Sequence, residues 1–272
     1  LEEFLTASGG ENLAAISVML VNNETGVIQP FAEVAELVRR LSPGTLVHCD
    51  AVQGFVWLDV GELCGPADLV SVSAHKFQGP QGVGALVVRE AARRRLSPVV
   101  VGGSQERELR PGTHNVAGAV GMGVAAELAS CERAAASARA GALGDLLVEL
   151  VSSGAAACKE AVPRPLRVGS ICNLRVPGVL AEELLFLLDE AGVCASAGSS
   201  CASGASEPSP VLAAMGTPVE AAREHVRFSL GYETTRQDIE DAAAVINGAA
   251  ARLRPANRAV GAPGPAPSGA GV

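Results

Sequence analysis

Residues 69–84 read LVSVSAHKFQGPQGVG, and the fold prediction starts from this stretch. The apolar residues 69–73 predict a short strand, and residues 84–88 predict another after a glycine-rich turn. Lys76 lies between them. Of the 21 basic residues in the chain, only Lys76 and Lys159 are lysines. A lysine amine can form a Schiff base, which arginine cannot do, so Lys76 is the first candidate for chemistry.

Strands and helices alternate on both sides of this stretch. Further strands are expected at residues 15–21 and 46–49, and helices at residues 31–41 and 115–130. This order predicts an α/β domain with a mostly parallel sheet over residues 1–130. The unbroken apolar run at 15–21 predicts a buried strand. Ligands of such sheets bind at the carboxyl ends of the strands, where Asp50 and Lys76 are both expected.

The pattern changes near residue 131 to a helical stretch followed by short strands and amphipathic helices. Strands are expected at 170–176, 193–197 and 226–230, and helices at 181–191 and 235–253. Residues 131–254 are therefore predicted to form a smaller α+β domain. Residues 255–272 are rich in Pro, Gly and Ala, and this composition predicts a disordered tail.

Composition limits the classes of function. The chain of 272 residues has 48% hydrophobic and 18% charged residues, which predicts a compact fold. A net charge of −8 argues against DNA or an anionic membrane as the main partner. Seven cysteines without a CxxC pair predict neither a disulfide framework nor a metal site, and favour a reducing, cytoplasmic location. Because the chain begins with Leu inside folded-type sequence, we expect it to lack an N-terminal part.

Several polar residues allow both a structural and a chemical interpretation. Asn23 follows the first predicted strand within a turn, and Asp50 could cap a following helical turn. Arg227 on a short apolar strand could form a core salt bridge or bind a carboxylate. Cys201 lies in a Gly/Ser-rich stretch whose composition predicts a flexible loop. Cys194, in the strand expected at 193–197, is predicted to be packed.

Three motifs together resemble the cysteine desulfurase family. They are Asp-Ala-Val-Gln at 50–53, Ser-Ala-His-Lys at 73–76 and Arg-Pro-Gly-Thr at 110–113. This family consists of class V aminotransferase-like, fold-type I enzymes that use pyridoxal 5'-phosphate. The similarity extends from about residue 17 to beyond residue 230. The Ser-Ser-Cys-Ala-Ser sequence before Glu-Pro-Ser, at 199–209, is similar to the family's longer nucleophile loop.

The resemblance implies a role for each site residue. Lys76 would hold pyridoxal 5'-phosphate and move the substrate α-proton, and Cys201 would accept sulfur. Asp50 would pair with the pyridinium nitrogen, and Gln53 and Asn23 would form hydrogen bonds to the ring oxygen, with Asn23 also facing the substrate. Ser73 and His75 would bind the phosphate, and His75 would also take part in proton transfer. Thr113 would contact the partner subunit's phosphate in a homodimer, and Arg227 would bind the substrate carboxylate.

The implied reaction converts L-cysteine to L-alanine and leaves a Cys201 persulfide for an acceptor protein, such as an iron–sulfur scaffold, or for tRNA thiolation. The family's Gly-Ala-Thr phosphate loop and ring-stacking His are not found in this chain, so the cofactor pocket is expected to be incomplete. Three alternatives stay open. They are a selenocysteine lyase, which Pro111 favours, an aminotransferase-like relative that forms no persulfide, and a truncated, non-catalytic interaction protein.

Overall fold

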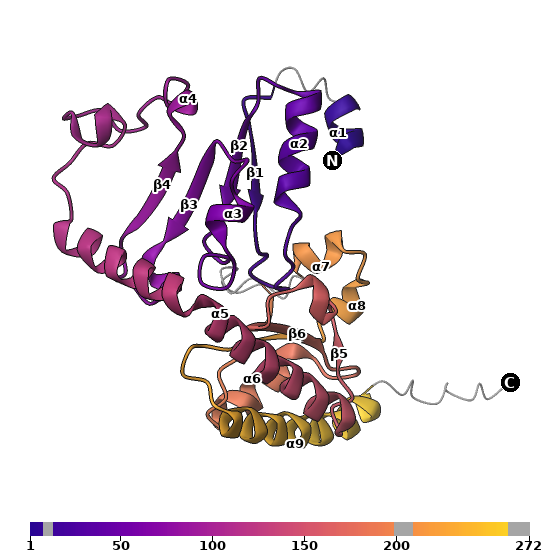
Figure 1. Cartoon of the computed structure of the whole chain (residues 1–272). Coiled ribbons are helices and arrows are strands. Elements are labelled where there is room, and N and C mark those ends of the chain that lie inside the picture. The colour runs from indigo at the N-terminus through magenta and orange to yellow at the C-terminus, as the bar shows by residue number, and fades with distance from the viewer. Residues whose placement is uncertain (8–12, 199–208, 261–272) are drawn as a thin grey trace, which may run out of the picture. The chain divides into compact units, whose positions relative to one another are not determined.

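The computed structural model describes residues 1–7, 13–198 and 209–260, with side chains up to residue 254 (Figure 1). The chain forms two compact units. Unit 1 comprises Leu1–Asn23, Val27–Arg139 and Leu166–Val168, and unit 2 comprises Glu24–Gly26, Ala140–Pro165 and Gly169–Val272. The sequence placed a domain boundary at 130/131, whereas the main change of unit falls at 139/140, inside the long helix α5 (Val116–Ser153).

Unit 1 is built on a four-stranded sheet of order β1-β2-β3-β4. The strands β1 (Ala15–Met19), β2 (Leu46–Asp50) and β3 (Leu69–Ser73) are parallel, and β4 (Gly84–Val88) is antiparallel to β3. This confirms the predicted α/β class with a mostly parallel sheet. The helical segments of unit 1 besides α5 are α1 (Glu2–Ala7), α2 (Phe31–Leu41), α3 (Val60–Leu63), η2 (Ala74–Phe77), α4 (Glu90–Arg93) and η3 (Gln105–Glu108).

Helix α2 shows how the sequence pattern produces an element of unit 1. Phe31, Ala35 and Val38 recur at helical spacing and are buried, so the helix presents one apolar stripe to the sheet side. Pro30 precedes the first helical residue, where its missing N–H costs no intrahelical bond. Arg39 and Arg40 occupy the last turn, where positive charge is favourable.

The prediction of a buried strand at 15–21 was wrong for β1, and only Leu20 and Val21, which follow the end of β1, are buried. Residues of β1 alternate between exposed and half-buried, and Met19 is 37% exposed. The strand lies at the end of the sheet order and pairs with β2 alone. Full burial requires cover on both faces, which a hydrophobic run alone does not supply.

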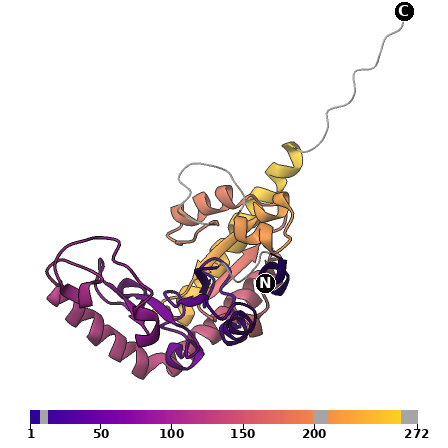
Figure 2. The ribbon, with the colours of Figure 1, turned by 90° about the horizontal axis from the view of Figure 1, so that it is seen from above.

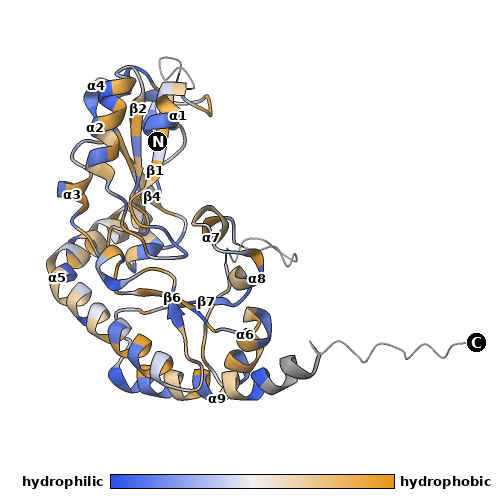
Figure 3. Ribbon diagram, turned by 90° about the vertical axis from the view of Figure 1, so that its right-hand side faces the viewer, coloured by the Kyte–Doolittle hydropathy of each residue, from blue (hydrophilic) through white to orange (hydrophobic). Residues whose placement is uncertain are grey.

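Unit 2 contains a three-stranded antiparallel sheet of β5 (Lys159–Glu160), β6 (Ile171–Arg175) and β7 (His225–Ser229). Its core combines residues of α5, β6, β7 and two further helices, α6 (Ala181–Glu190) and α9 (Arg236–Val260). The apolar and polar faces of α9 are visible in Figure 3, and its buried residues follow helical spacing. The short segments α7 (Pro210–Ala214), α8 (Val219–Ala222) and η4 (Arg164–Leu166) complete the described elements.

Three local predictions for this part of the chain need correction. The helix expected at 115–130 and the helical stretch expected after residue 131 form one helix, because α5 continues unbroken to Ser153. Residues 193–197 form no strand, although Ser196 makes a bridge to Arg227, and Cys194 is exposed. Helix α9 continues to Val260 (Figure 2), six residues into the predicted disordered tail.

Within the part of the chain that the structure describes, no helix has both the length and the apolar character needed to cross a bilayer.

Candidate active site

Lys76 lies on the 3-10 segment η2, directly after β3. Ala74 and Phe77 are buried, while His75 and Lys76 are exposed. Phe77 packs against Phe55 with ring centroids 4.5 Å apart. The two apolar residues therefore anchor the short segment, and the amine of Lys76 stays accessible.

The chain turns sharply after Lys76. Gln78 has a φ of 64°, in the left-handed region, and its neighbour Gly79 donates a backbone hydrogen bond to Ala74 O at 2.9 Å. A Cβ at Gly79 would lie 2.9 Å from Ala74 Cβ and 3.3 Å from Ala125 Cβ. Only glycine fits this close approach, as the glycine-rich stretch predicted.

Ser73 and His75 contact one another at the end of β3. The distance from Ser73 Oγ to His75 Nδ1 is 2.9 Å. This hydrogen bond orients the imidazole beside the hydroxyl, so the two groups form a joint polar site next to Lys76. Such a pair can donate hydrogen bonds to an anion.

Asp50 ends the neighbouring strand β2 and lies opposite Ser71 of β3. Its Oδ1 accepts a hydrogen bond from Val52 N at 3.0 Å, which stabilises the turn that contains the half-buried Gln53. The capping role that the sequence allowed for Asp50 is thus present in part. Because this bond uses Oδ1, the carboxylate keeps a second oxygen that can accept a proton donor.

His48 shares a strand face with Asp50, because the two residues are two positions apart. Its Nδ1 lies 2.8 Å from Ser17 Oγ, and its buried Nε2 has no hydrogen-bond partner among the described residues. Burial lowers the pKa of His48, and the charge of Asp50 opposes this shift. Sequence reasoning missed this imidazole, although it is part of the same His-Cys-Asp sequence.

The polar residues of unit 1 meet at one edge of the sheet. Asn23 follows β1 in a turn closed by the hydrogen bond from Asn22 N to Val27 O at 2.9 Å. Asp50 ends β2, and Ser73 ends β3. Since β1, β2 and β3 are adjacent and parallel, their carboxyl ends share this edge. From strand ends alone the sequence predicted this position for Asp50 and Lys76, whereas the roles of Asn23 and Ser73 were implied only by the family resemblance.

The remaining predicted residues lie elsewhere. Thr113 is exposed on the loop between η3 and α5, where Gly112 has a φ of 106°. Arg227 belongs to unit 2 and is half-buried on β7. Its backbone exchanges two hydrogen bonds with Ser196, at 2.7 and 3.1 Å. Cys201 lies outside the described residues.

Unit 2 contains a buried polar network that the sequence did not indicate. Ser209 Oγ donates to the buried carboxylate of Glu24 at 2.5 Å and caps α7. Asn173 Nδ2 donates to Glu24 O at 3.1 Å, and Asn173 Oδ1 lies 2.7 Å from His225 Nδ1. Glu24, in the turn after β1, is therefore bound to Ser209, the residue that follows positions 199–208.

The polar edge of unit 1 fits a cofactor that carries an aldehyde, a basic ring nitrogen and a phosphate. Lys76 supplies an accessible amine, Asp50 a carboxylate, and the pair Ser73–His75 hydrogen-bond donors for an anion. Among the described residues, no group of three or more His, Cys, Asp or Glu side chains could hold a metal ion.

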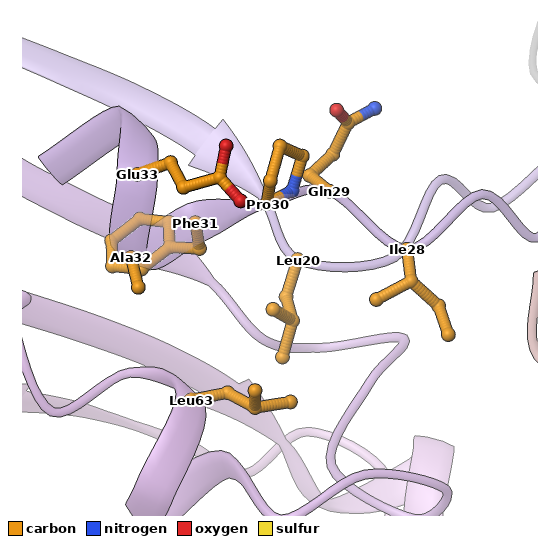
Figure 4. A pocket seen from close by; sticks show the side chains of 8 residues that line it. All are labelled: Leu20, Ile28, Gln29, Pro30, Phe31, Ala32, Glu33 and Leu63. Carbon is orange, nitrogen blue, oxygen red and sulfur yellow. The ribbon is translucent and has the colours of Figure 1, made fainter. Parts of the chain in front are cut away.

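A separate apolar hollow with a volume of about 290 Å³ lies between β1, α2 and α3. Leu20 and Leu63 face one another across it, and Phe31 lies beside them (Figure 4). None of the predicted site residues lines this hollow, and its apolar walls offer little to a phosphate.

Comparison with known proteins agrees with this geometry. The family model for aminotransferase class-V matches residues 2–241. The cysteine desulfurase IscS of Dictyoglomus turgidum is 41% identical over 226 residues, which cover 82% of this chain and 56% of that protein. The IscS-like cysteine desulfurase of Mycobacterium tuberculosis is 38% identical over 245 residues, covering 90% of this chain and 61% of the relative. The chain thus spans about three-fifths of the length of these curated relatives.

Solved structures give the same result. A NifS-like protein superimposes with a TM-score of 0.82 at 30% identity, covering 93% of this chain and 65% of the other. DndA from Streptomyces lividans superimposes with a TM-score of 0.68 at 36% identity, covering 84% and 64% respectively. The resemblance found in the sequence is confirmed, and the chain belongs to the aminotransferase class-V family.

Proposed function

We propose that this chain carries the chemistry of a pyridoxal-phosphate-dependent cysteine desulfurase, which takes sulfur from L-cysteine and leaves L-alanine. The observation that carries the proposal is the grouping of Asn23, Asp50 and the segment Ser73–Lys76 at the carboxyl ends of three adjacent parallel strands. Relatives of which this chain spans about three-fifths are named cysteine desulfurases, and they support the same assignment.

The residues of unit 1 would hold the cofactor and move protons. Lys76 would bind it covalently through Nζ and, once displaced by substrate, take the α-proton. Asp50 would accept a hydrogen bond from the protonated ring nitrogen, while Gln53 and Asn23 would donate to the ring oxygen. Ser73 and His75 would bind the phosphate. The bound cofactor would supply an electron sink for the substrate carbanion.

The residues of unit 2 would bind the substrate and accept its sulfur. The guanidinium of Arg227 suits a carboxylate because its planar fork can donate two parallel hydrogen bonds. Cys201 follows Ser196 by five residues, and Ser196 is bound to the backbone of Arg227. The role proposed for Cys201 requires these five residues, which can span at most about 18 Å, to bring its thiol to the substrate sulfur.

In the sulfur-transfer step, the Cys201 thiolate attacks the sulfur of bound L-cysteine. The new S–S bond forms as the substrate Cβ–S bond breaks, and the electron pair of the broken bond stays with the substrate carbon. That carbon accepts a proton to give L-alanine, and Cys201 keeps the sulfur as a persulfide. Each turnover thus converts one L-cysteine and one thiol to one L-alanine and one persulfide.

The same proposal extends to partners and location. An acceptor protein, such as an iron–sulfur scaffold, would take the persulfide sulfur. Thr113, exposed on its loop, would contact the phosphate bound by a second subunit in a homodimer. All six cysteines of the described residues are free thiols, in keeping with a reducing, cytoplasmic compartment. Activity assays should include L-selenocysteine, because Pro111 favours a selenocysteine lyase as the second candidate.

The first test is the visible absorption spectrum of the chain after addition of pyridoxal 5'-phosphate. The parent chain should show the band of the lysine-bound cofactor, and Lys76→Ala should lose it, because no other group in unit 1 provides a primary side-chain amine. The matched control is Lys159→Ala, which removes the only other lysine, an exposed residue of β5, and should keep the band.

The second test uses L-cysteine and measures L-alanine together with the persulfide on Cys201. Cys201→Ala should keep the absorption band and lose both products. Equal bands in Lys76→Ala and the parent chain would refute the role of Lys76. Full L-alanine production by Cys201→Ala would instead favour an aminotransferase-like enzyme that forms no persulfide. A parent chain without any band would favour the non-catalytic interaction protein.

A further inference from the structure

Two buried thiols of unit 1 are in direct contact. Cys49 lies on β2 and is 0% exposed, and Cys64 caps the C-terminus of α3 and is 4% exposed. Their Sγ atoms are 3.2 Å apart, and both cysteines are free. Fifteen positions separate them in the sequence, so the contact is a product of the fold.

The two thiols are not equivalent. The hydrogen bond with Cys49 lowers the pKa of Cys64, although burial opposes this shift. The same hydrogen bond, followed by burial, raises the pKa of Cys49. The lowered pKa favours the thiolate on Cys64, whose sulfur is in hydrogen-bond contact with the Cys49 sulfur. Cys64 is also slightly more exposed than Cys49, although both are buried.

From this contact we propose that Cys49 and Cys64 form a reversible thiol–disulfide site that takes low-molecular-weight disulfides as its oxidant. In the first step the Cys64 thiolate attacks one sulfur of the small disulfide, and one small thiol leaves. In the second step Cys49 loses its proton and attacks the Cys64 sulfur of the mixed disulfide, and the second small thiol leaves. Two protein thiols are oxidised to one disulfide, and the oxidant is reduced to two thiols.

The surroundings of Cys64 give the oxidant a route. Leu63, the preceding residue, is 36% exposed and borders the apolar hollow between β1, α2 and α3 (Figure 4). Opening the last turn of the four-residue helix α3 exposes the Cys64 sulfur, while β2 keeps Cys49 in place. A disulfide requires the sulfurs to approach to about 2.05 Å, a movement of roughly 1 Å from the contact observed.

Oxidation would join α3 to β2 at the residue directly before Asp50. Neither thiol has a part in the proposed desulfurase chemistry, so a test of this disulfide does not depend on whether the proposed function is correct. The expected product is a disulfide between two cysteines that lie 15 positions apart in the sequence. The thiols of Cys131 and Cys194 are exposed and free, and they should retain the small thiol as mixed disulfides.

The test treats the folded chain with oxidised glutathione and then digests it without reduction. A glutamate-specific protease cleaves after Glu62 and separates the two cysteines, which trypsin does not do because no Lys or Arg lies between residues 40 and 76. Mass spectrometry should find the two peptides joined and 2 Da lighter than their sum, with the link removed by dithiothreitol. In a triple variant with Cys131→Ser, Cys194→Ser and Cys201→Ser, treatment with oxidised glutathione should reduce the number of titratable thiols by two.

Matched controls decide the outcome. Adding Cys64→Ser to the triple variant should abolish the thiol loss, because Cys49 alone is buried and unreactive. Adding Cys158→Ser, which removes another buried thiol, should leave the loss unchanged. The proposal is overturned if the Cys49–Cys64 link is absent once Cys131 and Cys194 of the parent chain have reacted, or if it forms only in urea-unfolded chain.

Discussion

At the scale of single residues, His225 is the one histidine of unit 2, and it is buried. Burial, and then the charge of Arg175, lowers the pKa of His225 from 6.5 to about 4, while Glu224 opposes the shift. The hydrogen bond to Asn173 Oδ1 requires a proton on Nδ1, which a neutral imidazole can provide. The folded state therefore keeps His225 neutral at pH values where the unfolded chain protonates it.

This difference predicts a loss of stability in acid. Between pH 6.5 and about 4 the unfolded state binds more protons than the folded state, so the free energy of unfolding falls as the pH falls through this window. His225→Asn keeps a donor near the Nδ1 position and removes the titration. Between pH 7 and pH 5, the free energy of unfolding measured in urea should fall by at most about 2 kcal/mol more in the parent chain than in the variant. Parallel losses in the two proteins would contradict the assignment.

The sequence identified some of these residues better than others. Lys76 was proposed as a site residue because lysine is so rare in the chain, and Asp50 because it ends an apolar strand. The network of Glu24, Asn173 and His225 was missed, because Asn173 lies 149 positions from Glu24. No local pattern indicates such a partner, and a buried carboxylate in a turn looks like an exposed one until its partners are known.

At the scale of elements, helix α5 approaches another backbone segment very closely. A Cβ at Gly144 would lie 2.4 Å from Gly169 O and 3.2 Å from the Cys172 Sγ. Both contacts are within unit 2, and neither backbone oxygen nor buried sulfur can move aside easily. The glycine is therefore required by packing, although glycine weakens a helix interior.

A pair of glycine substitutions should separate packing from helix propensity. Gly144→Ala should destabilise unit 2 by about 1–3 kcal/mol, because the added methyl group overpacks the contact. Gly248→Ala on α9 has open space around it and should stabilise the same unit by up to about 1 kcal/mol. Denaturant unfolding of both variants measures whether each substitution lowers or raises the free energy of unfolding. Stabilisation by both substitutions would show that Gly144 is not tightly packed.

The elements themselves were largely predictable. Residues 69–73 and 84–88 form strands with the predicted bounds, because turn residues flank compact apolar runs. The exposure of β1 and the single strand-like bridge at Ser196 could not be predicted, because both depend on neighbours that lie far away in the sequence. Helix α5 continues through the predicted domain boundary at 130/131 because alanine-rich sequence continues on both sides of it.

At the scale of the whole molecule, the proposed chemistry is divided between the two units. The residues proposed for cofactor binding, from Asn23 to Thr113, belong to unit 1, whereas Arg227 and its neighbour Ser196 belong to unit 2. Substitutions in unit 2 should therefore change the handling of substrate without changing the affinity for cofactor. The change of sequence pattern placed a boundary near residue 131, whereas α5 passes from one unit to the other at 139/140.

Arg227→Lys tests this division. Lysine keeps the positive charge but loses the bidentate fork, so KM for L-cysteine should rise about 10–100-fold while the Kd for pyridoxal 5'-phosphate changes little. Arg236→Lys, on the exposed surface of α9, is the matched control and should leave both constants unchanged. A rise in the cofactor Kd as large as the rise in KM would show that Arg227 does not act on substrate alone.

The hydrogen bond between Glu24 and Ser209 also has a consequence for the order of synthesis. A ribosome adds the 185 residues that separate them after Glu24 has left the catalytic centre. At about 5–20 residues per second this takes roughly 10–40 s. Throughout that interval a carboxylate destined for burial has no Ser209 to bind. The side chain of Glu24 must therefore stay hydrated, or be held by a chaperone, until Ser209 has been made.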